Sequence, residues 1–94
     1  MRAVIISRPG GPEVLEIHDV ETPEPAGEQV RVRVRASGIN RADLLQRAGG
    51  YPAPPGSPSN IPGLEFAGEV DVVGPLARMW KPGQRVIGLA GGGA

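Results

Sequence analysis

The segment Ser37–Val70, SGINRADLLQRAGGYPAPPGSPSNIPGLEFAGEV, decides how this chain folds, because it holds the one convincing helix of the sequence. The helix is predicted over residues 40–48, since Asn40 is a good N-cap and Asp43 can complete a capping box. The glycine pair Gly49–Gly50 is expected to end it. Four residues give the predicted helix an apolar stripe: Ala42, Leu44, Leu45 and Ala48.

Two more elements are predicted after the helix. Residues 51–60, YPAPPGSPSN, form a long proline-rich loop that is expected to be stiff. Loops of this length in small domains are often functional. Residues 64–73, LEFAGEVDVV, are typical of a long strand, in which Gly68 is expected to mark a bulge or bend.

Upstream of this segment, residues 30–36 show the clearest strand pattern in the chain. Apolar side chains alternate with Arg31, Arg33 and Arg35, so the three arginines share one face of the predicted strand. One interpretation of that face is an anion-binding groove. The other, which we favour, is a solvated face whose arginines pair with carboxylates on a neighbouring strand.

Three further strands are predicted over residues 2–7, 13–20 and 85–89. They are short β-branched runs, and the 15 glycines and 11 prolines of the sequence lie largely between such runs. This arrangement favours an all-β barrel or sandwich. We expect Trp80 to be a hydrophobic plug under the loop that precedes the last strand.

The composition limits the classes of function. Ninety-four residues allow one small domain with a modest core. Ten basic and ten acidic side chains cancel, which gives no electrostatic reason to expect nucleic acid or an anionic membrane as partner. The absence of cysteine excludes disulfides and thiolate zinc sites. Without a signal peptide or an apolar run of membrane length, we expect a cytoplasmic protein.

Four motifs, in order and spacing, resemble the N-terminal catalytic domain of medium-chain dehydrogenases/reductases: MRAVIISRPGGPEVLEI, ASGINRADLLQRAGGYPAPPG, IPGLEFAGEV and KPGQRVIGL. The sequence is most similar to the zinc-free quinone oxidoreductase branch of that family, the zeta-crystallin-like enzymes. The resemblance implies that residues 1–94 are a mainly β, GroES-like domain, a partly open and incomplete barrel with one short helix. It also implies a Rossmann domain that binds NADPH, and this second domain is absent from the chain.

The resemblance also implies which residues form the site. Zinc-dependent members place cysteine and histidine ligands where this chain has Asn40 and Leu64, neither of which can replace them, so we expect no metal. In the zinc-free branch, the residues that match Asn40 and Tyr51 line the nicotinamide and quinone pocket, and we take both as catalytic and cofactor-binding candidates. Arg41 matches a position that contacts cofactor phosphate in some members.

Other residues have two interpretations or a structural one. Glu65 is either a buried functional carboxylate, as in the zinc-dependent relatives, or an ordinary strand residue. Asp43 and Arg47 are expected to be capping and helix-surface groups, and His18 to be structural. The terminal GLAGGGA is not interpreted as a phosphate-binding loop, because that motif must follow a strand and open a helix.

The expected function is therefore that of a catalytic-domain segment of a metal-free, NADPH-dependent quinone oxidoreductase. Such an enzyme transfers hydride from nicotinamide to a quinone or enone, and the full-length protein is expected to form a homodimer. The isolated 94 residues are expected to be inactive or nearly so. The alternative is a non-catalytic GroES-like module for binding or oligomerisation. A true co-chaperonin is disfavoured, because no loop offers a clear hydrophobic tripeptide at its tip.

Overall fold

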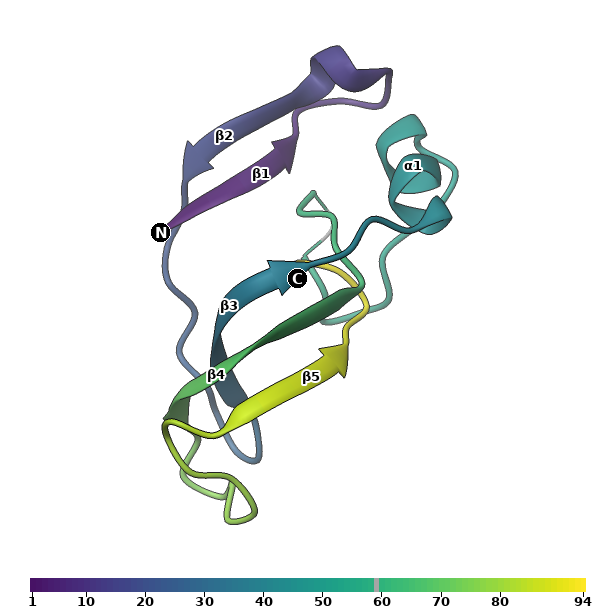
Figure 1. Cartoon of the computed structure of the whole chain (residues 1–94). Helices are drawn as coiled ribbons and strands as arrows, with labels where there is room; N and C mark the ends of the chain where they lie inside the picture. The colour runs from purple at the N-terminus through teal and green to yellow at the C-terminus, as the bar shows by residue number, and fades with distance from the viewer. Residues whose placement is uncertain (59) are drawn as a thin grey trace.

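A computed structural model describes residues 1–58 and 60–94. The described chain is mainly β, with two antiparallel sheets and one α-helix (Figure 1). One sheet has two strands in the order β1–β2, and the other has three in the order β3–β4–β5. Within the described residues the two sheets do not close into a barrel, which confirms the predicted class of a mainly β, partly open fold with one short helix.

The two-stranded sheet is a hairpin of β1 (Arg2–Ile6) and β2 (Leu15–Asp19). Its connection includes the short 3-10 helix η1 (Pro12–Val14). The strand predicted over residues 13–20 is therefore wrong at its start, because Pro12 fixes a φ that suits the first turn of a helix. Val14 in this turn is fully buried. Its backbone carbonyl accepts a hydrogen bond from the Ser7 backbone N–H over 3.0 Å.

The three-stranded sheet is formed by β3 (Val30–Ser37), β4 (Glu65–Val73) and β5 (Arg85–Leu89). These bounds agree with the predicted strands to within one residue at each end. The β3–β4 register shifts twice, so that Asp71 is an extra residue on β4 and Arg35 an extra residue on β3. The second shift lies opposite Gly68, which confirms the predicted irregularity there.

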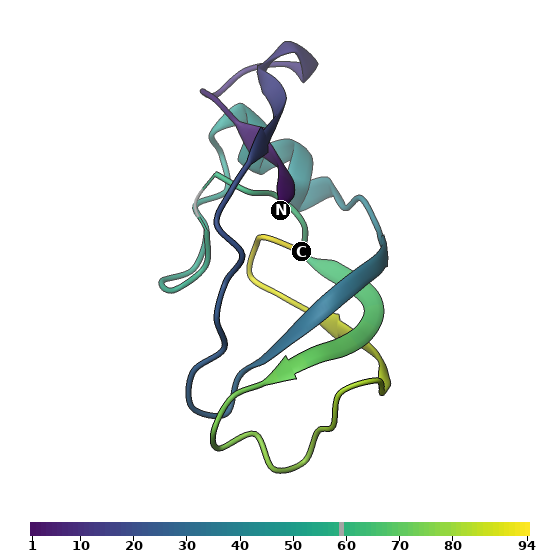
Figure 2. The same ribbon diagram turned by 90° about the vertical axis from the view of Figure 1, so that its left-hand side faces the viewer.

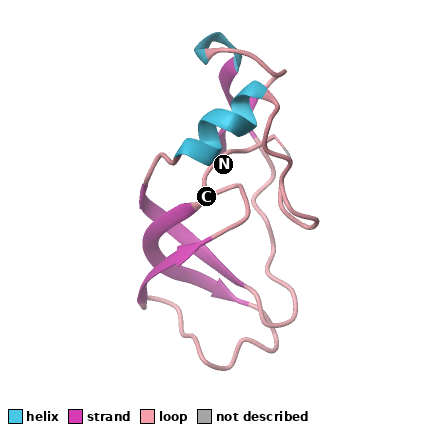
Figure 3. Cartoon of the chain, turned by 90° about the vertical axis from the view of Figure 1, so that its right-hand side faces the viewer, coloured by secondary structure: helices cyan, strands magenta, loops and turns pink. Residues whose placement is uncertain are grey.

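Helix α1 (Arg41–Ala48) lies between the hairpin and the three-stranded sheet (Figures 1 and 3). The connection of residues 74–84 lies at the far end of the sheet from α1, and the connection of residues 20–29 runs from the hairpin to that same end (Figure 2). They are joined by backbone hydrogen bonds, from Gly74 N–H to the Gln29 carbonyl and from Leu76 N–H to the Gly27 carbonyl, each over 2.8 Å. Long connections therefore cluster at both ends of the sheet, and α1 belongs to one of these ends.

The apolar stripe predicted for α1 does not form its packed side. Gln46 is the buried residue of the helix, with Asp43 and Arg47 half-buried, whereas Leu44 and Leu45 are 46% and 42% exposed. The prediction was wrong because α1 packs against loops, whose backbone groups bond to polar side chains. These loops are described with the site below.

The buried core of the described chain is small. Four apolar residues in it are buried: Ile5, Val14, Val70 and Ala77. Trp80 is 43% exposed, so it is not the buried plug that we predicted. Two large apolar side chains on β5, Ile87 and Leu89, are 85% and 87% exposed. A stripe of apolar surface therefore runs along this edge strand.

Candidate functional site

The first candidate residue, Asn40, lies immediately before α1. Its extended backbone, with φ of −117° and ψ of 160°, is that of an N-cap residue. The Asn40 backbone N–H donates to Oδ2 of Asp43 over 2.8 Å, and the Asp43 N–H donates to the Asn40 carbonyl over 3.0 Å. The predicted capping box is confirmed. It fixes the backbone of Asn40, which is half-buried at the start of the helix.

Asp43 makes a second contact that the sequence did not reveal. Its other carboxylate oxygen, Oδ1, accepts the backbone N–H of Gly63 over 3.0 Å. Gly63 is buried, and its φ of +118° lies in the region that favours glycine. Leu64, one of the two positions singled out from the sequence, follows it directly. Asp43 therefore joins the backbone of Asn40 to the turn that contains Leu64.

Tyr51, the second candidate, lies at the opposite end of α1. Gly49 ends the helix in the left-handed conformation at φ of 91°, and the half-buried Tyr51 follows two residues later. Eight helical residues span about 12 Å. The structure therefore places the two candidates just before the start and just after the end of α1. Arg41, the first helical residue, is exposed.

The end of α1 near Tyr51 is held by Arg47. Its Nε donates to the Gly10 carbonyl over 3.1 Å, and its own carbonyl accepts the Gly10 N–H over 3.0 Å. A side chain on Gly49 would contact Pro9 of the same loop at 3.2 Å. Arg47 is half-buried, so the expectation of a helix-surface group was wrong. It fixes α1 to the loop between β1 and β2.

The glycine-rich end of the chain packs beside the turn that precedes β4. The backbone N–H groups of Ala90, Gly93 and Ala94 donate to the carbonyls of Leu64, Ile61 and Gly63 respectively, over 2.8, 2.8 and 3.2 Å. N–H groups engaged in this way cannot cradle a phosphate. This agrees with the interpretation that the glycine run is not a dinucleotide fingerprint.

An open cleft of about 640 Å³ lies along the adjoining ends of the three strands of the larger sheet. It is lined mainly by apolar groups, among them Phe66, Ile87 and Leu89. Glu65 also lines the cleft and is exposed, with its carboxylate lying against Gly38. Of the two interpretations of Glu65, the buried carboxylate is therefore contradicted.

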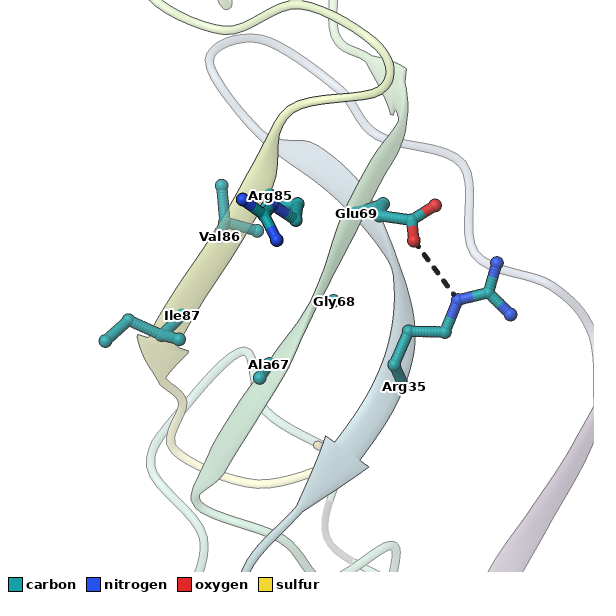
Figure 4. Close-up of a pocket in the computed structure, with 7 residues that line it drawn as sticks. All are labelled: Arg35, Ala67, Gly68, Glu69, Arg85, Val86 and Ile87. Atoms are coloured by element: carbon teal, nitrogen blue, oxygen red, sulfur yellow. Dashed lines mark ion pairs between the residues drawn. The ribbon is translucent and has the colours of Figure 1, made fainter.

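The arginines of β3 face carboxylates of β4. Arg31 pairs with Asp71 over 3.0 Å. Arg35 pairs with Glu69 over 3.4 Å, and Figure 4 shows this second pair. Arg33 also reaches Asp71 over 3.5 Å. The ion-paired strand face that we favoured is confirmed, and the anion-binding groove is not supported. The hollow of about 510 Å³ beside the pair of Arg35 and Glu69 is also lined by Arg85, whose guanidinium is a second positive charge there.

The described residues contain neither a side-chain cluster typical of a metal site nor a membrane-spanning helix. No three His, Cys, Asp or Glu side chains gather as a metal site would require, and His18 instead bonds Glu16 over 3.1 Å on the exposed hairpin. No helix in the described part of the chain is long and apolar enough to cross a bilayer.

A capped helix with a glycine turn and a bulged three-stranded sheet is the arrangement of a known domain class. The family model for the alcohol dehydrogenase GroES-like domain matches residues 26–92, and the chain belongs to this family. It is, more closely, the N-terminal GroES-like domain of a medium-chain dehydrogenase/reductase of the quinone oxidoreductase type.

The relatives make that placement specific. The quinone oxidoreductase of Pseudomonas aeruginosa is 50% identical over 82 residues, covering 87% of this chain and 25% of the relative. The Escherichia coli quinone oxidoreductase, solved in complex with NADPH, is 36% identical with a TM-score of 0.81, covering 93% of this chain and 26% of that one. The human synaptic vesicle membrane protein VAT-1 homolog-like protein is 34% identical with a TM-score of 0.90, covering 100% and 30%. The chain thus spans about a quarter of the length of its quinone oxidoreductase relatives.

Proposed function

We propose that this chain supplies the catalytic-domain segment of an NADPH-dependent quinone oxidoreductase that works without zinc. The observation that carries the proposal is the 50% identity to a quinone oxidoreductase over 87% of the chain. The placement of Asn40 and Tyr51, both half-buried and next to α1, supports it. The acceptor we propose is a quinone or another small enone.

Asn40 would orient an oxygen atom. A side-chain carboxamide carries two N–H donors and one acceptor oxygen, and a helix cap uses only the oxygen. The NH₂ group can therefore donate to a quinone or carboxamide oxygen while the cap stays formed. Because Asn40 is held by the capping box, its backbone position is set before the substrate arrives, which is the pre-organisation that close contact between reactants requires.

Tyr51 would bind a flat ring from the other end of α1. Its aromatic face suits a quinone, and its hydroxyl can orient the quinone oxygen. A phenolic side chain reaches several Å from its backbone, so it can approach a substrate that also contacts the Asn40 end. Arg41, exposed beside Asn40, would contact a cofactor phosphate that another part of the enzyme presents.

The fit of NADPH to the described residues is partial. Asn40 and Tyr51 suit the nicotinamide and its carboxamide, and a bound nicotinamide supplies the hydride. The end of the chain offers no evident phosphate cradle, because the N–H groups of Ala90, Gly93 and Ala94 already bond to residues 61–64. We therefore propose that other residues of the enzyme bind most of the cofactor, and that the isolated 94 residues do not turn it over.

The remaining parts of the proposal concern the whole enzyme. We propose a cytoplasmic homodimer, in keeping with a chain that has no cysteine and no net charge. Neither nucleic acid nor a membrane is proposed as partner.

A chimera tests this function. In it, the matching 82 residues of the Pseudomonas aeruginosa quinone oxidoreductase are replaced by those of this chain. We expect Asn40→Ala and Tyr51→Phe each to lower quinone-dependent NADPH oxidation by about 10- to 100-fold in kcat/KM, as loss of a positioned hydrogen bond does. Asp71→Asn on the ion-paired strand face is the matched control and should leave the rate unchanged. Parental kcat/KM in both site variants would refute the site assignment.

A non-catalytic binding module is the second candidate, and one observation favours it. The chain exposes 6555 Å², against about 5,100 Å² expected for a compact protein of this mass. Apolar residues contribute, among them Ile87 and Leu89 on β5 and Leu44 on the outer side of α1. A chimera that folds and binds NADPH but reduces no quinone would favour this candidate over the first.

A further inference from the structure

The turn before β4 contains a buried backbone N–H group that needs a hydrogen-bond acceptor. Gly63 is buried, and its N–H donates to Oδ1 of Asp43 over 3.0 Å. An unpaired buried N–H is costly, so few are left without a partner in folded proteins. Because the acceptor is a carboxylate, the bond is of the stronger, charge-assisted kind. The conformation of this turn therefore depends on a side chain twenty positions earlier in the sequence.

The same carboxylate holds the start of α1. Oδ2 of Asp43 accepts the N–H of Asn40 over 2.8 Å, so its two oxygens serve two separate backbone segments. Of the ion pairs recorded for the described residues, none involves Asp43. No arginine or lysine therefore competes for the carboxylate, and both oxygens are committed to backbone N–H groups.

We propose that Asp43 is a positioning residue, one that sets the place of Asn40 relative to the Gly63–Leu64 turn and thereby the place of the Asn40 side chain at the proposed substrate site. This goes beyond the role of a helix cap. A cap needs only the bond to Asn40, whereas positioning needs both bonds at once. The effect on catalysis rests on the proposed function. The mechanical link between the two backbone segments does not, and can be tested on the 94-residue chain itself.

Two substitutions separate the cap from the link. Asp43→Glu keeps a capping box, since glutamate is the residue that most often fills this third helical position. Its longer side chain moves the second oxygen away from Gly63, so the cap is kept and the link is lost. Asp43→Asn retains a single acceptor oxygen and weakens both bonds. The matched control is Asp71→Asn, which removes a half-buried carboxylate on the sheet, away from α1.

Amide hydrogen exchange of the full 94-residue chain tests the link. In Asp43→Glu we expect exchange at Gly63 to accelerate by about 10- to 100-fold while Asn40 stays protected. In Asp43→Asn both amides should exchange faster, and in Asp71→Asn neither should change. Unchanged protection at Gly63 in Asp43→Glu would overturn the proposal. If Asp43→Asn does not fold, Asp43→Glu alone still decides the question, because its cap is intact.

Kinetics of the chimeric enzyme test the consequence for Asn40. Asp43→Glu should lower kcat/KM by up to about 100-fold, as a misplacement of about 1 Å can. In the Asn40→Ala background the same change should cost little more, because the residue through which Asp43 acts is already gone. An equal loss in both backgrounds would show a general effect on the fold and overturn the positioning role. A chimera without any quinone reduction would refute the proposed function. The exchange data alone would then show whether Asp43 links the Asn40 and Gly63 backbones.

Discussion

Gly68 is the residue whose replacement tests our account of the larger sheet most sharply. It is buried in the central strand β4, opposite the point where β3 carries its extra residue Arg35. A methyl group added at Gly68 would lie 2.9 Å from both the Arg33 backbone carbonyl carbon and Cγ1 of Val32, and closer still to the Arg33 carbonyl oxygen. The Arg33 atoms belong to a paired strand and cannot rotate away, so Gly68→Ala must displace β3.

The expected cost follows from that geometry. Forcing one extra methyl group into a packed site costs about 1–3 kcal/mol, a large share of the roughly 5–15 kcal/mol by which such domains are stable. Each kcal/mol lowers Tm by about 4–8 °C in a domain of this size. We therefore expect Gly68→Ala to lower Tm by about 8–16 °C, for a cost of about 2 kcal/mol.

Thermal unfolding followed by circular dichroism is the assay, with Gly50→Ala as the matched control. At Gly50 the nearest atom to an added methyl group, the Leu45 carbonyl oxygen, is at an ordinary 3.7 Å. That variant should change the unfolding free energy by less than about 0.5 kcal/mol. Equal Tm values for Gly68→Ala and the wild-type chain would refute the close approach of β3 and β4 at this point.

Three further predictions concern charge and metal. Asp71→Asn removes the ion pairs with Arg31 and Arg33, so it should lower stability by about 0.5–1 kcal/mol at low salt; an equal loss in 1 M NaCl would contradict an electrostatic origin. The hydrogen bond from His18 lowers the pKa of Glu16, and stability from a lowered carboxyl pKa is present above its ordinary value of 4.5 and lost in more acidic solution. The Tm of Glu16→Gln should accordingly fall less than that of the wild-type chain between pH 6 and about 3, and parallel curves would contradict this. Zinc chelators should leave quinone reduction by the chimera unchanged, and a loss of activity that zinc restores would disprove the metal-free site.

Sequence patterns between neighbouring residues predicted most of the fold and part of the site. The alternation of Val and Arg predicted β3, and Asn40 with Asp43 predicted the start of α1, because both patterns act between neighbouring residues. The bond from Asp43 to Gly63 could not be predicted, since its acceptor and donor are twenty residues apart and the donor is a backbone group. A partial signal existed: an aspartate in the first turn of a helix has a second oxygen that a single cap does not use.

The errors have a related physical cause. Leu44 and Leu45 were assigned to the packed side of α1 because apolar periodicity usually marks the buried face. Here α1 packs against loops, which offer backbone carbonyl and N–H groups, and the polar side of the helix satisfies them. Trp80 was also expected to be buried, under a loop, but the connection that contains it leaves this residue 43% exposed. Hydrophobic patterns predict burial where a sheet or helix provides the partner surface, and less well against loops.

The measurement that tests the central claim most directly is quinone-dependent NADPH oxidation by the chimera that carries this chain in the Pseudomonas aeruginosa enzyme. If these residues form a working catalytic domain of a quinone oxidoreductase, the chimera should retain kcat/KM within about tenfold of the parent enzyme, a difference of about 1.4 kcal/mol in transition-state stabilisation. A chimera that folds and binds NADPH but oxidises it no faster than the uncatalysed reaction would contradict the claim.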